Sequence, residues 1–305
     1  MRVLVTGGAG FIGSNLAKRL IAEGHDVTVL DDFSSAHWSN LAELKGDVVT
    51  CDIAEGCGVL DSLPAFDVVF HQASITDTTV HDQRRMMQKN VEGFRILLEL
   101  AIKWKSRVIW ASSASIYGRR QPPNSETQPP DPLNVYAASK MVMERLAECY
   151  RERLKQPIIG LRYFNVYGPG EDHKGKFASM IHQLARQMRA GKRPRIFTAG
   201  EQKRDFVYVD DVVQANLKAV TARESGVYNV GCGQAFTFNQ VVAELNRVMG
   251  TELPPEYFDN PYSFTQDWTE ANVSESRRAL GYEPRYDLRK GIEAYHETGK
   301  LGLSV

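Results

Sequence analysis

The stretch Arg2-Val-Leu-Val-Thr-Gly-Gly-Ala-Gly-Phe-Ile-Gly13 decides the fold of this chain. Its first residues are apolar and β-branched, which predicts a short buried strand. Glycines then interrupt the run, and helical spacing begins at Phe11. In such a strand–turn–helix unit, Gly7 permits the tight turn, Gly10 lets backbone amides approach a phosphate, and Gly13 lets the helix pack on the strand. Because unpaired amides at the start of a helix favour an anion, the stretch predicts a site for a dinucleotide pyrophosphate.

The second predicted strand ends at two carboxylates, Asp31 and Asp32. An acid about 20 residues past the glycines suits a ribose 2′-hydroxyl and repels a 2′-phosphate. Residues 32–44 contain no Lys or Arg that could bind such a phosphate, although His37 and Lys45 lie nearby. The residues therefore favour NAD slightly over NADP.

The rest of the chain alternates strands and helices. Apolar strands are predicted to begin near residues 2, 26, 47, 66, 106 and 157, and the clearest amphipathic helix covers residues 90–104. Such alternation predicts an α/β fold with a doubly wound parallel sheet. After Gly168 the pattern loosens, with helices expected near residues 179–190, 238–249 and 290 and a strand near 227. We expect a dinucleotide-binding Rossmann domain in residues 1–168 plus about 205–232, and a smaller substrate-binding portion in 169–204 plus 233–305.

The composition excludes several classes of partner. Of the 305 residues, 43% are apolar, and the 37 basic residues balance 37 acidic ones, so nothing indicates nucleic acid or an acidic membrane surface. No signal peptide and no apolar run of about 18 residues is present. The four cysteines show no metal-ligand or disulfide pattern and are expected to be scattered thiols, although Cys51 and Cys57 could pair. These features predict a cytoplasmic protein without a bound metal.

A second decisive segment is Tyr136-Ala-Ala-Ser-Lys140. On a helix, side chains at i and i+4 share one face, so the ammonium lies beside the phenol. That cation, with the charge of a nicotinamide nearby, is expected to lower the tyrosine pKa. Ser113, at the end of the predicted strand from Val108, can orient the same substrate hydroxyl. Together with the dinucleotide site, these residues predict hydride transfer at a carbon that bears a hydroxyl.

With these segments in place, the chain resembles the extended short-chain dehydrogenase/reductases that modify nucleotide sugars. Further landmarks are Ser112-Ser-Ala-Ser-Ile-Tyr-Gly118, Arg162-Tyr-Phe-Asn-Val-Tyr-Gly168 and Arg204-Asp-Phe-Val-Tyr-Val-Asp210. The resemblance covers nearly the whole length and implies a catalytic set of Ser113, Tyr136 and Lys140, with a nucleotide-diphosphate sugar as substrate. It also implies that Arg204 binds the diphosphate, for which a planar guanidinium is suited.

A narrower resemblance, to the ADP-glycero-manno-heptose 6-epimerases, rests on three segments: Asp77-Thr-Thr79, the loop from Gly168 to Ser179, and the tail Asn260-Pro-Tyr262 with Trp268-Thr-Glu-Ala-Asn272. In those enzymes a lysine of a His-Lys-Gly loop acts as the second base, which implies this role for Lys174. The chain departs from the pattern at His71-Gln-Ala-Ser74, at Gln183, where some relatives have histidine, and at Lys176, which replaces a small hydroxyl residue.

The resemblance also implies two sets of contacts. The cofactor contacts are Gly7, Gly10, Phe11, Ile12, Gly13, Asp31, Asp32, Asp52, Ile53, Gln72, Ala73, Ser74, Asn90, Tyr136, Lys140 and Val166. The substrate contacts are Thr78, Asn165, Lys176, Gln183, Phe197, Arg204 and Tyr262. Asp52 fits a helix N-cap equally well. Family precedent favours NADP, whereas the residues after Asp31 favour NAD.

The implied reaction is a redox-neutral inversion at C6, in which Tyr136 and Lys174 handle protons on opposite faces of the sugar. One alternative is a UDP-hexose 4-epimerase, which needs no second base because the whole keto-sugar turns over. A remote alternative is a dinucleotide-sensing scaffold without catalysis, which the presence of both Tyr136 and Lys140 disfavours. The family resemblance implies a homo-oligomer, with helices near 90–104 and 141–154 as candidate contacts.

Overall fold

The computed structural model describes residues 1–56, 58–259 and 266–303, so the predicted contact Tyr262 lies outside the described residues. A parallel sheet of seven strands forms the centre, in the order β10-β6-β5-β4-β1-β2-β3. This order contains the arrangement 3-2-1-4-5-6 of doubly wound dinucleotide-binding sheets. The predicted fold class is therefore confirmed. The strands are β1 (Arg2–Thr6), β2 (Asp26–Asp31), β3 (Asp47–Thr50), β4 (Val68–His71), β5 (Arg107–Ser113), β6 (Ile158–Tyr163) and β10 (Gly226–Val230).

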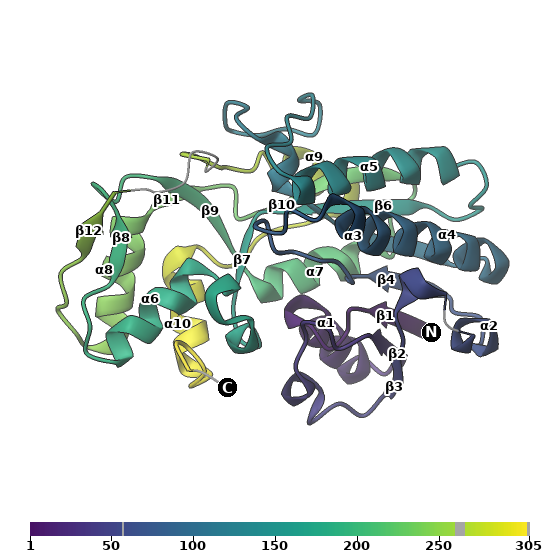
Figure 1. Ribbon diagram of the computed structural model, residues 1–305, viewed down its shortest axis with the longest axis horizontal. Helices are drawn as coiled ribbons and strands as arrows, with labels where there is room; N and C mark the ends of the chain where they lie inside the picture. The colour runs from purple at the N-terminus through teal and green to yellow at the C-terminus, as the bar shows by residue number, and fades with distance from the viewer. Residues whose placement is uncertain (57, 260–265, 304–305) are drawn as a thin grey trace.

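Helices cover both faces of this sheet (Figure 1). On one face α1 (Phe11–Ala22) and α7 (Val209–Ala219) pack together, and on the other lie α4 (Gly93–Trp104) and α5 (Val135–Tyr150). The strands between them carry continuous apolar runs because both faces are buried. Leu16 and Val212 contribute to the core on the first face, and Phe94, Trp110 and Met143 form the core on the second.

The start of α5 shows how local sequence sets the register of the site. Asn134 has an extended backbone and its side-chain oxygen accepts a hydrogen bond from the backbone amide of Ala137, at 2.8 Å. This cap satisfies one of the amides that a helix leaves free in its first turn. The helix therefore begins at Val135, which puts Tyr136 in its first turn and Lys140 one turn later.

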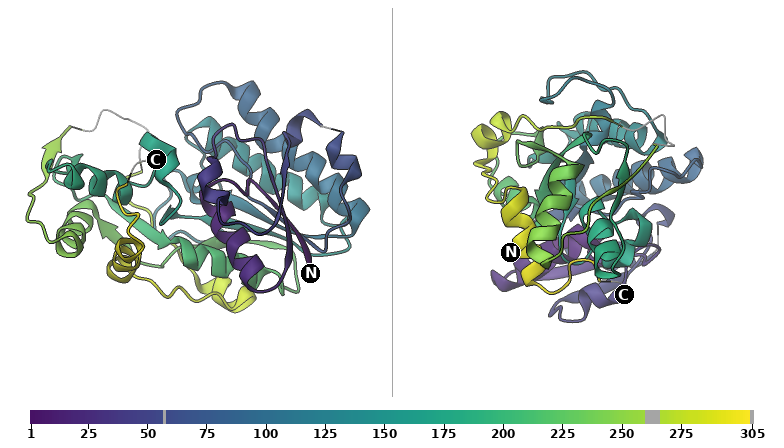
Figure 2. Two further views of the ribbon diagram at one scale, coloured as in Figure 1. Left: turned by 90° about the horizontal axis from the view of Figure 1, so that it is seen from below. Right: turned by 90° about the vertical axis from the view of Figure 1, so that its left-hand side faces the viewer.

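A smaller portion lies beside the central sheet (Figures 1 and 2). It contains α6 (Met180–Arg189), α8 (Phe238–Met249) and α10 (Leu288–Glu297), which confirm the three predicted helices. The sequence did not predict its small sheets, one of which has the order β11-β9-β7 and the other pairs β12 with β8. Their bounds are β7 (Asn165–Tyr167), β8 (Arg195–Phe197), β9 (Lys203–Tyr208), β11 (Ala235–Thr237) and β12 (Glu256–Phe258). The shorter helices are α2 (Val59–Ser62), α3 (Gln83–Met87) and α9 (Ser274–Leu280).

The cysteines and the membrane-spanning potential of the helices were also predicted from the sequence. Cys149 and Cys232 are free thiols, but Cys51 is disulfide-bonded, so the prediction of scattered thiols is wrong for Cys51. The structure therefore has the alternative that the sequence left open, in which Cys51 takes part in a disulfide. None of the helices in the described ranges combines the length and apolar character needed to cross a membrane.

The predicted division at residues 169–204 and 233–305 stays a prediction. The core of the smaller portion draws on α6, α8 and α10 but also includes Phe11 of α1, which packs beside the central sheet. Apolar packing is therefore continuous between the two portions.

Candidate active site

A cavity of about 1220 Å³ lies between the carboxyl ends of the central strands and the smaller portion. It is lined by residues that follow β1 and β4, the neighbouring strands where the strand order reverses. Ligands of doubly wound folds bind at such a reversal. The cavity brings together most of the predicted site residues: Gly7, Gly10, Phe11, Ile12, Gly13, Asp31, Asp32, Asp52, Ile53, Gln72, Ala73, Ser74, Ser113, Tyr136, Lys140, Asn165, Val166, Lys174, Gln183, Phe197 and Arg204.

The glycine turn after β1 has the shape that a dinucleotide requires. Gly7 adopts a positive φ of 65°, and a β-carbon there would lie 2.5 Å from the backbone nitrogen of Ala73. A β-carbon on Gly13 would lie 2.2 Å from the carbonyl oxygen of Gly7. Helix α1 begins after Gly10 without a side-chain cap. Its first-turn amides therefore face the cavity as donors for an anion, so the residues present fit a dinucleotide pyrophosphate.

Two carboxylates lie at the end of β2. Asp31 is buried and accepts hydrogen bonds from the amides of Ala9 and Phe33, both at 2.9 Å. Burial raises the pKa of Asp31, and these backbone donors oppose the rise. Asp32 is exposed and accepts from the amide and hydroxyl of Ser34, at 2.9 and 2.7 Å. This end of the cavity is therefore acidic, as the sequence predicted.

Beyond β3, Asp52 has the N-cap role that the sequence left open. Its side chain accepts from the amide of Ala54 at 3.0 Å and forms an ion pair with Lys89. Lys89 lines the cavity and also contacts Glu55 at 3.1 Å. Sequence reasoning missed Lys89, because the pairing joins segments 37 residues apart.

Asn90 is not among the residues that line the cavity. Its side chain is fully buried and bonds the amide of Ile75 at 2.8 Å, the carbonyl of Ile75 at 3.1 Å and the hydroxyl of Ser139 at 3.0 Å. Asn90 therefore holds the backbone after β4 against α5, one layer behind the cavity.

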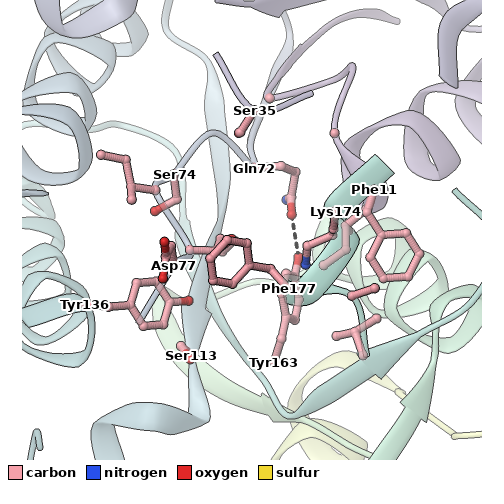
Figure 3. Close-up of a pocket in the computed structure, with 18 of the residues that line it drawn as sticks. Phe11, Ser35, Gln72, Ser74, Asp77, Ser113, Tyr136, Tyr163, Lys174 and Phe177 are labelled. Atoms are coloured by element: carbon pink, nitrogen blue, oxygen red, sulfur yellow. Dashed lines mark hydrogen bonds between the residues drawn. The ribbon is translucent and has the colours of Figure 1, made fainter. Parts of the chain in front are cut away.

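Ser113, Tyr136 and Lys140 meet at the carboxyl end of β5. Figure 3 shows the Ser113 and Tyr136 side chains together at one side of the cavity, and the Ser113 hydroxyl accepts a hydrogen bond from the amide of Ser115 at 3.2 Å. The Lys140 ammonium lies 5.8 Å from the centre of the Tyr136 ring and donates to the carbonyl oxygen of Ala111 at 2.7 Å. The helical spacing thus forms the predicted cluster.

Burial shifts the pKa values of both Tyr136 and Lys140 in this cluster. Burial raises the pKa of the Tyr136 phenol, and the nearby Ser113 hydroxyl opposes the rise. Burial lowers the pKa of Lys140 to about 7, against the attraction of Glu144. The ammonium points to Ala111, and loss of water dominates the pKa of both groups. The prediction that Lys140 and a nicotinamide charge together lower the tyrosine pKa stays a prediction.

Lys174 lies on the opposite side of the cavity from Tyr136, with Phe177 between them (Figure 3). Its ammonium is 5.8 Å from the centre of the Phe11 ring. Burial lowers the pKa of Lys174, and the nearby carboxylate of Glu171 opposes this. Lys176, two residues along, is exposed, stays outside the cavity lining and lies over the Phe177 ring. A turn at Gly175, with φ of 55°, separates the two lysines.

The smaller portion supplies the rest of the lining. Arg204 on β9 lies with its guanidinium 5.9 Å from the ring of Phe238, and burial lowers its pKa to about 10. The rings of Phe197 and Phe258 meet edge to face at 5.0 Å, where β8 and β12 pair. The Gln183 amide donates to the carbonyl oxygen of Ala178 at 2.7 Å. These residues form an apolar, cationic pocket that suits a nucleoside diphosphate.

One predicted substrate contact lies outside the cavity lining, and several lining residues were not predicted. Thr78 is not among the lining residues. Sequence reasoning missed several residues that do line the cavity: His71, Arg85, Lys89, Phe177, Arg195, Phe206, Phe238 and Phe258. The short apolar pairs Ile196-Phe197 and Tyr257-Phe258 were the available signal, but they did not show that these strands pair with each other.

The chain is similar to known proteins over nearly its whole length. A model of the NAD dependent epimerase/dehydratase family matches residues 3–231. ADP-L-glycero-D-manno-heptose-6-epimerase of Brachyspira hyodysenteriae is 36% identical over 314 residues, covering 97% of each chain. The crystal structure of the enzyme of that name from Helicobacter pylori superimposes with a TM-score of 0.92 at 42% identity, covering 97% of this chain and 95% of that one. The Thermotoga maritima UDP-glucose 4-epimerase, solved with UDP-glucose, has a TM-score of 0.91 at 33% identity, with coverage of 97% and 98%.

Proposed function

Because this chain belongs to the NAD dependent epimerase/dehydratase family, we propose that it inverts C6 of ADP-D-glycero-D-manno-heptose without net oxidation of the sugar. One observation carries the proposal. Lys174 lines the cavity on the side opposite Tyr136. Two proton carriers on opposite sides of the cavity can serve the C6 hydroxyl of both epimers, whereas an epimerase that turns over the whole keto-sugar needs only one. The names of the similar proteins from Brachyspira hyodysenteriae and Helicobacter pylori support the heptose as substrate.

A nicotinamide held by the turn from Gly7 to Gly13 would supply reversible hydride chemistry at C6, so the overall reaction would be redox-neutral. Tyr136, beside the Ser113 side chain, handles the hydroxyl proton of one epimer. Lys174 handles the corresponding proton of the other epimer from the opposite side. Burial lowers the pKa of Lys174, which increases the fraction of neutral amine near neutral pH. The keto-sugar turns between the two groups while the proton taken by one is replaced by a proton from the other.

The binding residues divide between the two portions. The turn from Gly7 to Gly13 would hold the cofactor pyrophosphate through its free amides. Arg204 would bind the diphosphate of the sugar nucleotide, and Phe197 with Phe258 would enclose its base. This division leaves the sugar in the middle of the cavity, between Tyr136 and Lys174.

We infer that the cofactor is NAD rather than NADP. The support is the acidic end of β2, where Asp31 and Asp32 lie beside the lining residues Ser34, Ser35 and Ala36 without a cation in that segment. A 2′-phosphate there would face two carboxylates. Mass spectrometry of the nucleotide released from the purified protein tests this inference, and NADP as the main species would contradict it.

A decisive experiment incubates the purified protein with ADP-D-glycero-D-manno-heptose and follows the C6 configuration by NMR. Wild type should convert the substrate without net formation of NADH. Lys174→Met and Tyr136→Phe should each abolish conversion, because each removes one proton carrier. The matched control is Lys192→Met, which removes an exposed lysine in the turn after α6 and should convert normally.

The second candidate is UDP-hexose 4-epimerisation, which the similarity to the Thermotoga maritima enzyme favours. That reaction needs Tyr136 but not Lys174. Turnover of UDP-glucose that survives in Lys174→Met, with no conversion of the heptose by wild type, would establish it and overturn the 6-epimerase proposal.

We also infer that the enzyme works in the cytoplasm as a homo-oligomer. The family to which the chain belongs supports both inferences. Light scattering of the purified protein after gel filtration tests the oligomer, and a monomer mass at micromolar concentration would contradict it.

A further inference from the structure

The loop that carries Lys174 is joined to the cofactor-binding turn by a buried asparagine, Asn40. Asn40 lies in a short 3₁₀ turn (Trp38–Leu41) and is 7% exposed. Its amide nitrogen donates to the carbonyl oxygen of Ala9 at 3.0 Å and to that of Gly170 at 3.3 Å. The same nitrogen lies 3.3 Å from Nδ1 of His173, the residue before Lys174. One side chain therefore contacts both the glycine turn, at Ala9, and the loop that carries Lys174, which is called the base loop below.

Asn15 of α1 reinforces this connection. Its side-chain amide donates to the carbonyl oxygen of Pro169 at 2.9 Å and to that of Phe11 at 2.9 Å. Gly170 adopts a positive φ of 95°, which turns its backbone toward both asparagines. A β-carbon there would lie 3.4 Å from the Asn15 amide nitrogen and 3.5 Å from the Asn40 side-chain oxygen. The backbone before Lys174 is thus packed directly against the cofactor-binding unit.

The other end of the loop is tied to the smaller portion through Glu171. This carboxylate is fully buried and accepts hydrogen bonds from the amide of Gly168 at 3.1 Å and the hydroxyl of Ser179 at 2.9 Å. The Lys174 amide in turn donates to the Glu171 carbonyl oxygen at 2.9 Å. Glu171 therefore fixes the loop to the start of α6, whereas Asn15 and Asn40 connect it to the stretch that carries the glycine turn.

From these contacts we infer that Asn40 is a positioning residue for Lys174, which sets the distance between that base and the bound dinucleotide. The inference rests on the proposed function. Asn40 lies four residues after Ala36, the last residue of the segment that lines the predicted ribose end of the cavity. A catalytic group displaced by about 1 Å can lose about 10²-fold in rate. Loss of the asparagine should therefore slow the step that uses Lys174 and spare the step that uses Tyr136.

The test uses Asn40→Leu, which keeps the approximate shape of the side chain, adds no charge and removes the donor. Reduction of bound NAD is followed by absorbance after mixing with each C6 epimer separately. In Lys174→Met, one epimer should lose this partial reaction and the other should keep it. Asn40→Leu should slow the same epimer by about 10²-fold, leave the other within about twofold, and reduce kcat of epimerisation more than it changes KM.

The matched control is Asn246→Leu. Asn246 also ties a loop to its own helix, donating to the carbonyl oxygen of Leu253 at 3.0 Å and accepting from the hydroxyl of Thr251 at 2.8 Å. It lies at the end of α8 and has no contact with the base loop. Asn246→Leu should lower the unfolding temperature but affect both epimers equally. Equal slowing of both epimers in Asn40→Leu, or a change only in cofactor affinity, would overturn the inference.

A second readout does not depend on the substrate. In protein labelled with ¹³C at the lysine ε-carbons, the Lys174 signal is assigned by its loss in Lys174→Met. Asn40→Leu should shift this signal and its pH titration, whereas Asn246→Leu should not. An unchanged Lys174 signal would overturn the positioning role. Failure of wild type to convert the heptose, with the shift present, would instead contradict the proposed substrate and leave the positioning role standing.

Discussion

The two sides of the cavity are built in different ways. Tyr136, Lys140 and Ser113 come from α5 and the end of β5, regular elements whose spacing fixes how their side chains meet. Lys174 comes from a short irregular loop that long-range contacts hold, through Asn40 on one side and Glu171 on the other. The first side is therefore determined by local geometry and the second by tertiary structure, so mutations should affect the two sides differently.

The largest expected effect separates the two bases. Tyr136→Phe and Lys174→Met should each reduce kcat of epimerisation by roughly 10²–10⁴-fold, the usual contribution of a general acid–base group. Each variant should still reduce bound NAD with one epimer, and the surviving epimer should differ between them. Stopped-flow absorbance with each epimer measures this. Survival of the same epimer in both variants would show that Lys174 is not the second base.

The next prediction concerns the buried ammonium on the tyrosine side. Because burial lowers the pKa of Lys140 to about 7 in the folded protein, the unfolded chain binds more protons than the folded chain from pH 7 up to the ordinary lysine pKa. Stability should therefore rise with pH through that window, by about 2 kcal/mol between pH 7 and 9. Urea unfolding at both pH values, in the cofactor-free protein, measures the change.

The control for this prediction is Lys140→Met. The variant lacks the titrating group, so its stability should change less between the same pH values than that of wild type. Parallel pH dependence in the two proteins would contradict the assigned pKa shift.

A smaller effect is expected for the diphosphate contact. Arg204→Lys keeps the positive charge but loses the planar fork, so KM for the nucleotide sugar should rise by about tenfold. The kcat should change little, since the diphosphate is remote from the reacting carbon. Initial rates over a range of substrate concentration test this. A fall in kcat at constant KM would indicate that Arg204 acts on the reacting sugar instead.

The smallest effect is expected for Asp32, the exposed carboxylate that follows β2 at the predicted ribose end of the cavity. Asp32→Asn keeps the acceptor for the amide and hydroxyl of Ser34 but removes a carboxylate charge. Because Asp32 is exposed, solvent screens its repulsion of a 2′-phosphate. The ratio of the Kd for NADP to that for NAD should therefore fall only severalfold, as measured by calorimetry. An unchanged ratio would assign the discrimination to Asp31 alone.

The contrast between the two sides also explains which parts of the fold and of the site could be predicted from the sequence. The glycine turn, the six sheet strands up to β6 and the Tyr136–Lys140 pair follow from short-range patterns, since strand and helix periods are set by backbone geometry. Those patterns correctly grouped the residues at the ends of β1, β2, β4 and β5. The same reasoning missed β8 and β12, whose pairing joins residues about 60 positions apart.

The sequence by itself thus determined the doubly wound fold and the arrangement of the first base, because both depend on residues within a few turns of one another. Only the tertiary structure decided that Lys174 lies in the cavity while Lys176 lies outside it, and that Asn40 links the base loop to the glycine turn. The physical reason is the same in each case: burial and long-range hydrogen bonds depend on which distant segments meet, and spacing along the chain does not record this.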